Sequence, residues 1–139
     1  YNQYMIKPRA LGKKELFQRW GTEIVPLLDE VIKAVDADWT EDDVELSVNK
    51  NESVVFICET NNAIKGLIVL TPRTIFDTLE LHCWATVVKP PLKLKDYWDW
   101  IKFQGKCLGA EKITLETNRP MGRKFKFLKP VYTKYELRV

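Results

Sequence analysis

Glycine and histidine are scarce in this chain, whose 139 residues contain six glycines and a single histidine. No apolar run approaches the roughly 20 residues of a membrane-spanning helix, so no membrane segment is expected. One histidine and three scattered cysteines have no metal-ligand spacing, so no metal site is predicted. The odd number of cysteines argues against a disulfide framework and indicates buried, reduced thiols in a cytoplasmic protein.

Charge is not in large excess either, since the formal net charge is +3. Residues 36–43 (DADWTEDD) are acidic, and residues 119–134 carry six lysines and arginines. A basic segment can mark a nucleic-acid contact, but solvated Lys and Arg on a surface helix are the commoner explanation. We therefore do not expect a nucleic-acid partner. The length suits one domain with one core, spanning residues 1–139.

The hydrophobic pattern predicts the secondary structure, and its clearest element is a helix over 24–35 with apolar residues at helical spacing. Asn61-Asn62 predicts a hairpin turn, because Asn tolerates positive φ. The other expected elements are strands at 5–11, 44–48, 53–60, 63–71, 78–88, 112–117 and 132–139, helices at 13–20 and 96–108, a short helix or turn at 120–128, and loops at 36–43 and 72–77.

This order predicts an α/β (α+β mixed sheet) fold. An antiparallel meander is followed by a strand–helix–strand crossover, which gives a mostly antiparallel twisted sheet with helices on both faces.

The junction between the strand at 78–88 and the following helix reads VVKPPLKLKDYWDWIK (87–102), with no glycine until Gly105. In many cofactor-binding folds such a junction is glycine-rich, so that backbone amides can hold a phosphate. Asp96 is the predicted N-cap of a helix over Tyr97–Leu108. In that position its carboxylate would accept hydrogen bonds from the same amides and repel an anion.

The order of elements resembles the GNAT superfamily of acyl-CoA N-acyltransferases over residues 5–139. The matching stretches are VVFICETNNAIKGLIVL, LELHCWATVVKP and KITLETNRPMGRKFKFLKPVYTKYEL. The stretch LELH before the junction is also similar to GNAT-like proteins of tailed phages, some of which are virion components. The resemblance implies a GNAT fold and, in an active member, acetyl-CoA as cofactor.

The resemblance also locates a cofactor site, from which this sequence departs. The family signature is Arg or Gln, two variable residues, Gly, one more residue, then Gly or Ala. It falls on residues 93–98 (KLKDYW), where Asp96 and Trp98 replace the small residues. Lys93 and Lys95 are the residues left to contact a phosphate, and Asn118 matches a family asparagine. Seven positions later the family often has a tyrosine that protonates the departing thiolate. Here that position is Phe125, which has no proton to give.

Glu80 and His82 are the candidate catalytic residues if the protein is an enzyme. On a strand they share one face with Trp84, and either is a candidate general base, acting directly or through water. A polar pair on an exposed or helix-covered sheet face is the alternative.

Trp98 and Trp100 are two residues apart on one predicted helix, which suggests that they cannot both face one core. An exposed tryptophan is typical of a protein interface. Together with the basic Arg123 and Lys124 they form a candidate interface, and packing against the first helices is the alternative.

Two functional hypotheses follow. The first is a non-catalytic GNAT-like structural or interaction protein with a degenerate acetyl-CoA site and no cofactor. Its partners would be other proteins or a second copy of itself, and it could be a phage virion component. The alternative is a divergent acetyl-CoA-dependent N-acetyltransferase that uses Glu80 or His82 as base and Lys93 on the pyrophosphate.

Overall fold

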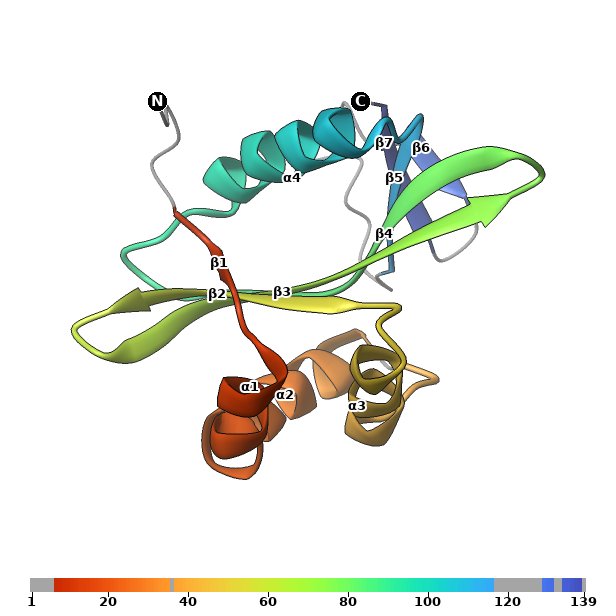
Figure 1. Cartoon of the computed structure of the whole chain (residues 1–139). Helices are drawn as coiled ribbons and strands as arrows, with labels where there is room; N and C mark the ends of the chain where they lie inside the picture. The colour runs from red at the N-terminus through yellow and green to blue at the C-terminus, as the bar shows by residue number, and fades with distance from the viewer. Residues whose placement is uncertain (1–6, 36, 117–128, 132–133, 139) are drawn as a thin grey trace.

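The structure, a computed structural model, describes residues 7–35, 37–116, 129–131 and 134–138. Its elements, in chain order, are β1 (Arg9–Ala10), α1 (Lys13–Arg19), a π-helical segment (Trp20–Ile24), α2 (Val25–Val35), α3 (Glu41–Asn49), β2 (Val54–Thr60), β3 (Ala63–Ile75), β4 (Thr78–Val88), α4 (Leu94–Leu108), β5 (Lys112–Glu116), β6 (Lys129–Val131) and β7 (Lys134–Arg138). One sheet lies between two helical layers, with α1, α2 and α3 on one face and α4 on the other (Figure 1).

The sheet has the strand order β1-β2-β3-β4-β5-β7-β6 among the described residues. The pair β4 and β5 is parallel and is connected through α4. Every other neighbouring pair is antiparallel. The predicted mixed, mostly antiparallel sheet with helices on both faces is therefore confirmed.

Two hydrophobic clusters share this sheet, one under each helical layer. Successive residues of β3 alternate between them, because side chains of a strand point to opposite faces. Leu67 and Val69 pack with α1, α2 and α3, whereas Ile68 and Leu70 pack under α4. A strand covered on both sides needs apolar residues throughout, which explains the unbroken run Leu67 to Leu70.

The hairpin between β2 and β3 confirms the predicted turn, since Asn61 and Asn62 have φ of 53° and 65°. The following hairpin differs from expectation, because residues 72–75 extend β3 and only Phe76 and Asp77 form the turn. The first strand is confined to Arg9–Ala10 within the described residues, shorter than the predicted 5–11.

The predicted strand at 44–48 is wrong, because these residues belong to helix α3. Val44 and Val48 are four residues apart and buried on one helical face, whereas Leu46 between them is exposed. The acidic stretch before them, predicted to be a loop, supplies the start of this helix. Thr40 and Asp43 form a capping box, in which the Thr40 amide donates to Asp43 Oδ2 at 2.8 Å.

Helix α4 begins at Leu94, two residues earlier than predicted, and Lys93 is its N-cap. The assignment of Asp96 as the N-cap is therefore wrong. Asp96 lies within the first turn, where a carboxylate is favoured by the helix dipole without capping the helix. The helix ends as expected at Gly109, whose φ of 74° suits glycine.

Trp98 and Trp100 are both buried under α4, with exposed fractions of 4% and 5%. The expectation that they cannot share one core is wrong, because both belong to the cluster between α4 and the sheet. Trp100 packs edge-on against Phe56 of β2, with ring centroids 4.9 Å apart. Both side chains are thus packed in a core, but on the opposite face of the sheet from the first helices, so the predicted packing against those helices is wrong as well.

Cys58 and Cys83 are buried, as expected, whereas Cys107 is exposed, and none of these three described cysteines is in a disulfide. In the described part of the chain no helix is long and apolar enough to cross a membrane. No group of three or more metal-binding side chains is found among those same residues.

Candidate active site

A β-bulge interrupts β4 at Trp84. On β3, Val69 pairs with Ala85 and the next residue, Leu70, pairs with Cys83, so Trp84 is the extra residue. A bulge bends its strand and increases the local twist. It also changes the alternation of side chains, so that Trp84 and Ala85 both face the layer of α1, α2 and α3.

The bulge coincides with the point where β4 and β5 separate. Their parallel pairing runs from Glu80 and Lys112 to Cys83 and Leu115. From Trp84 to Val88, β4 pairs with β3 only, among the residues that the structure describes. Figure 1 shows β4 continuing beneath α4 while β5 leaves it. The backbone groups along this edge of β4 therefore need another partner or water.

The N-terminus of α4 follows directly after this edge. The N-cap Lys93 makes no side-chain hydrogen bond to the helix. The amides of Leu94 and Lys95 have no acceptor inside the helix, because a helix leaves its first amides unpaired. Lys93 and Lys95 are exposed beside them, and Asp96 is half-buried. Helix N-termini with cations beside them can hold an anion.

Tyr97 holds this helix end against the sheet. Its side chain is fully buried and its hydroxyl lies over Gly66 of β3. Burial, with the neighbouring Cys58 thiol, raises the pKa of Tyr97, so the phenol stays neutral. Burial likewise raises the pKa of Cys58. Tyr97 and Trp98 thus point into the core, away from the free amides.

Glu80 and His82 lie on the sheet face predicted for them, the one that Trp84 shares. Arg73, opposite Glu80 on β3, forms an ion pair with the Glu80 carboxylate. His82 Nδ1 lies 2.8 Å from Thr114 Oγ1 on β5. Both predicted residues are buried, with exposed fractions of 7% and 2%. Their burial restricts direct contact with a ligand and leaves room for contact through water.

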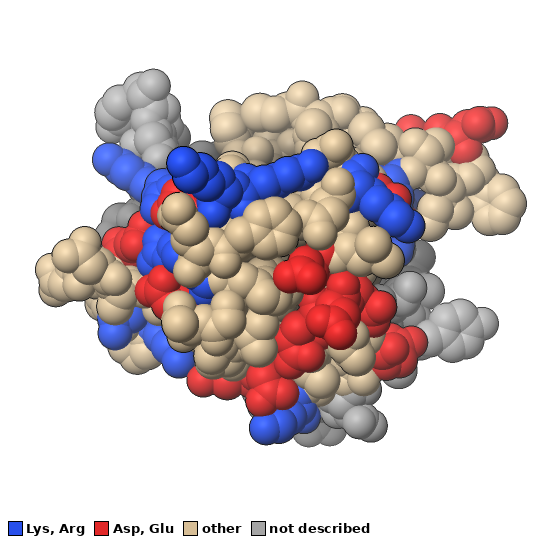
Figure 2. All heavy atoms as spheres, turned by 60° about the horizontal axis from the view of Figure 1, so that its bottom comes forward, with Lys and Arg blue, Asp and Glu red and all other residues tan. Residues whose placement is uncertain are grey.

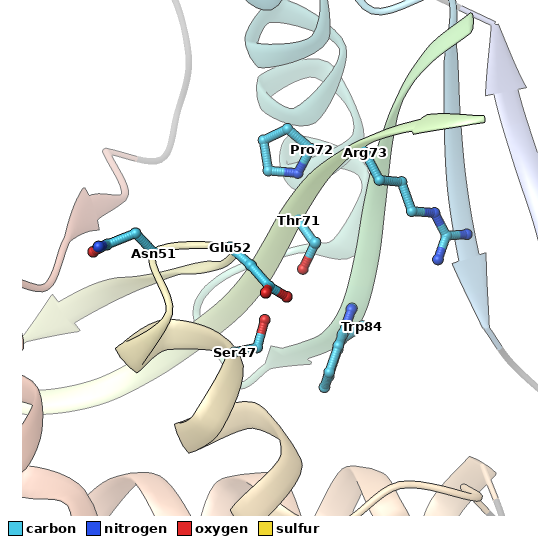
Figure 3. Close-up of a pocket in the computed structure, with 7 residues that line it drawn as sticks. All are labelled: Ser47, Asn51, Glu52, Thr71, Pro72, Arg73 and Trp84. Carbon is cyan, nitrogen blue, oxygen red and sulfur yellow. The ribbon is translucent and has the colours of Figure 1, made fainter. Parts of the chain in front are cut away.

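A pocket of about 620 Å³ opens next to this face, between the end of α3, the end of β3 and Trp84. This volume is in the range of small-molecule sites. Figure 3 shows Ser47, Glu52, Thr71 and Trp84 around its interior, with Asn51 and Arg73 pointing away. The pocket lies on the face of the sheet that α1, α2 and α3 cover.

Four residues of interest from the sequence, Asn118, Arg123, Lys124 and Phe125, lie outside the described residues. Conversely, the pocket-lining residues Glu52 and Thr71 were not predicted from the sequence, and Ser47 lay in a segment predicted to be a strand. The capping-box pattern Thr40-x-x-Asp43 was the signal for a helix there. The bulge and the strand separation leave no comparable signal.

Comparison with protein-family models finds no match, and neither does a search of curated proteins. Solved structures do match. A GNAT family acetyltransferase from Brucella melitensis, in complex with acetyl-CoA, has a TM-score of 0.63 at 14% identity, covering 98% of this chain and 89% of that one. The fold is that of the GNAT acetyltransferases.

Two further GNAT-fold structures show the same likeness. A predicted acetyltransferase from Clostridium acetobutylicum, solved with acetyl-CoA, has a TM-score of 0.62 at 16% identity, covering 92% of this chain and 93% of that one. A GNAT family acetyltransferase from Elizabethkingia anophelis, with acetyl-CoA bound, has a TM-score of 0.60 at 13% identity, covering 96% and 98%. At these identities the likeness establishes the fold. None of these structures is described as a phage or virion protein.

Proposed function

We propose that this protein is an acetyl-CoA-dependent N-acyltransferase. The observation that carries the proposal is the separation of β4 from β5 after Cys83 and Leu115, directly before the uncapped N-terminus of α4. An extended ligand with a phosphate at one end fits such an arrangement. The three GNAT-fold structures described above, all solved with acetyl-CoA, agree with this ligand.

The residues at the α4 N-terminus fit the pyrophosphate of acetyl-CoA despite the missing glycines. The free amides of Leu94 and Lys95 donate along the direction favoured by the helix dipole. Lys93 and Lys95 add two exposed positive charges. Asp96 opposes an anion but does not occupy the amides. Along the β4 edge, backbone groups that pair with no other strand among the described residues suit the two amides of the pantetheine arm.

Bound acetyl-CoA would supply a thioester, and transfer forms a C–N bond to an amine while the C–S bond breaks and the thiolate takes a proton. The chain's own contribution is to accept the proton that the amine loses. Glu80 and His82 are the candidates, on the face that carries Trp84. Arg73 and Thr114 hold them in place. Because both are buried, water would relay the proton.

The competing hypothesis is a non-catalytic GNAT-like protein. Its main support was the prediction that Asp96 is the N-cap of α4 and occupies the backbone amides that would bind a phosphate, and this assignment was wrong. The two hypotheses make opposite predictions for acetyl-CoA binding.

Thermal unfolding with acetyl-CoA tests the proposal. Ligand at about 100 times its Kd should stabilise the protein by about 2.7 kcal/mol, which is about 9 °C in Tm for a domain of this size. The variants Lys93→Gln and Lys95→Gln should each weaken binding about fivefold, on the order of 1 kcal/mol for an exposed charge. Asp96→Asn should strengthen it.

The matched control is Lys106→Gln, which removes an exposed lysine from the other end of α4. Its affinity should equal that of the wild type. No shift of Tm for the wild type at millimolar acetyl-CoA would refute the proposal and favour the non-catalytic hypothesis.

A further inference from the structure

The pocket between α3, β3 and Trp84 contains a chain of three buried hydroxyls. Ser47 Oγ lies 2.6 Å from Ser53 Oγ, which in turn hydrogen-bonds Thr71 Oγ1. The three side chains are at least nine-tenths buried. Ser47 belongs to α3, Ser53 precedes β2 and Thr71 belongs to β3. The hydrogen-bonded hydroxyls therefore link these three segments beside the pocket.

This hydroxyl chain has unused hydrogen-bonding capacity. Each hydroxyl carries one proton and two lone pairs, and the two bonds of the chain use only two of the three protons. Ser47 and Thr71, the ends of the chain, both line the pocket. Neither makes another side-chain hydrogen bond within the described part of the molecule. Each hydroxyl already has at least one partner within this group, and the capacity left at Ser47 and Thr71 is available to a polar ligand or water in the pocket.

The charges around the pocket favour a cation. The carboxylate of Glu52 lies at the pocket and is exposed. The C-terminus of α3, which ends at Asn49, directs the negative end of its dipole to the same place. Arg73 also lines the pocket, but its charge is balanced by Glu80. Figure 2 shows that Asp and Glu side chains gather in a band on the side of the molecule where α1, α2 and α3 lie.

Trp84 adds a second feature that suits a cation. Its half-buried indole lines the pocket and packs against Trp39, with ring centroids 5.8 Å apart. An indole face attracts an ammonium group. Trp84 is also the bulged residue at which β4 separates from β5. Trp84 therefore belongs both to the lining of the pocket and to the start of the β4 edge proposed to bind acetyl-CoA.

We propose that this pocket binds the acceptor substrate and that the acceptor is a small diamine. One ammonium group contacts Glu52 and the hydroxyls of Ser47 and Thr71, and the second nitrogen lies at Trp84, toward the separated edge of β4. The assignment as acceptor rests on the proposed acyltransferase function. The binding of a diamine in the pocket does not, because the pocket is formed by this chain's own α3, β3 and β4.

The test is calorimetric titration of the full chain, without acetyl-CoA, using 1,4-diaminobutane as probe. The matched neutral probe is 1,4-butanediol, which has the same length and no charge, and it should not bind measurably. Glu52→Gln should weaken diamine binding about fivefold. Asp42→Asn, which removes an exposed carboxylate at the other end of α3, should change it less than about twofold.

Thr71→Val tests the pocket floor, since it removes one end of the hydroxyl chain and keeps the side-chain shape. Diamine binding should weaken by a similar factor. Circular dichroism and Tm would verify that each variant is folded. Trp84→Phe is the second variant, because it keeps an aromatic ring with a weaker cation attraction and leaves the hydroxyls in place.

The outcomes separate this inference from the proposed function. Acetyl-CoA binding without diamine binding would overturn the inference and leave the acyltransferase proposal intact. Diamine binding without acetyl-CoA binding would support the ligand assignment and overturn the acyltransferase proposal. Equal binding of diamine and diol, or equal loss in Glu52→Gln and Asp42→Asn, would also overturn the inference. Formation of N-acetyl-diaminobutane, reduced in Glu52→Gln, would support both.

Discussion

Gly66→Ala should be among the most disruptive small substitutions in this protein. A Cβ at Gly66 would lie 1.5 Å from Tyr97 Oη, 2.8 Å from Tyr97 Cζ and 3.2 Å from Leu92 Cδ1. Ordinary contact distances would require the phenol end to move by about 2 Å. Tyr97 is fully buried in the first turns of α4, so the helix end must move with it.

The expected cost is at the upper end of the range for overpacked cores, about 3 kcal/mol. For a domain of this size that lowers Tm by about 10 °C. Tyr97→Phe removes the closest atom. That hydroxyl is buried without a well-formed hydrogen bond, so its loss should leave stability unchanged or raise it by about 1 kcal/mol.

A double-mutant cycle tests this reasoning. The wild type, both single variants and the double variant would be unfolded in urea and followed by circular dichroism. The two substitutions should couple by about 1–2 kcal/mol, with Gly66→Ala costing less when residue 97 is Phe. Simple additivity would show that Tyr97 does not lie over Gly66. Gly66→Ala should also weaken acetyl-CoA binding, because it displaces the free amides of α4.

Two further predictions concern stability. Asp77 has a φ of 62° in the turn between β3 and β4, so Asp77→Gly should raise Tm by about 3 °C, or about 1 kcal/mol; a lower Tm would contradict this. Hydrogen bonds lower the pKa of Glu15 to about 2, with the larger effect from Arg9 and the smaller from Arg19. The pKa of Glu59 is lowered below its usual value of 4.5, here mainly by Arg19 and less strongly by Arg9. These carboxylates take up a proton at higher pH in the unfolded chain than in the folded protein, so the free energy of unfolding measured in urea should fall from pH 5 toward pH 2. The fall should be less steep in Glu15→Gln, and parallel curves for the two proteins would refute this.

Local signals in the sequence determined most of the strands and the long helix. The β-branched runs around Val55 and Val69, with Asn61-Asn62 between them, specify a hairpin within about 20 residues of chain. Gly109 marks the end of α4 for a reason equally local, its positive φ. The mostly antiparallel mixed sheet follows from the order of these elements.

Where two local patterns fit the same residues, the tertiary structure decided. Val44, Leu46 and Val48 alternate like a strand, and Val44 with Val48 also fits one face of a helix. Packing against the sheet buries the two valines and leaves Leu46 outside. In the same way Trp98 and Trp100 reach one core, because large side chains on the flanks of α4 extend to the broad sheet beneath it.

The candidate site depends on relations that no local segment contains. The bulge at Trp84 exists only as a mismatch of register between β3 and β4, and the open edge of β4 only as the end of its pairing with β5. The hydroxyl chain joins residues 6 and 18 positions apart. By itself the sequence determined most of the strands and the long helices, because those preferences act within a few residues. Only the tertiary structure decided which side chains line the pocket, because that depends on how distant segments pack.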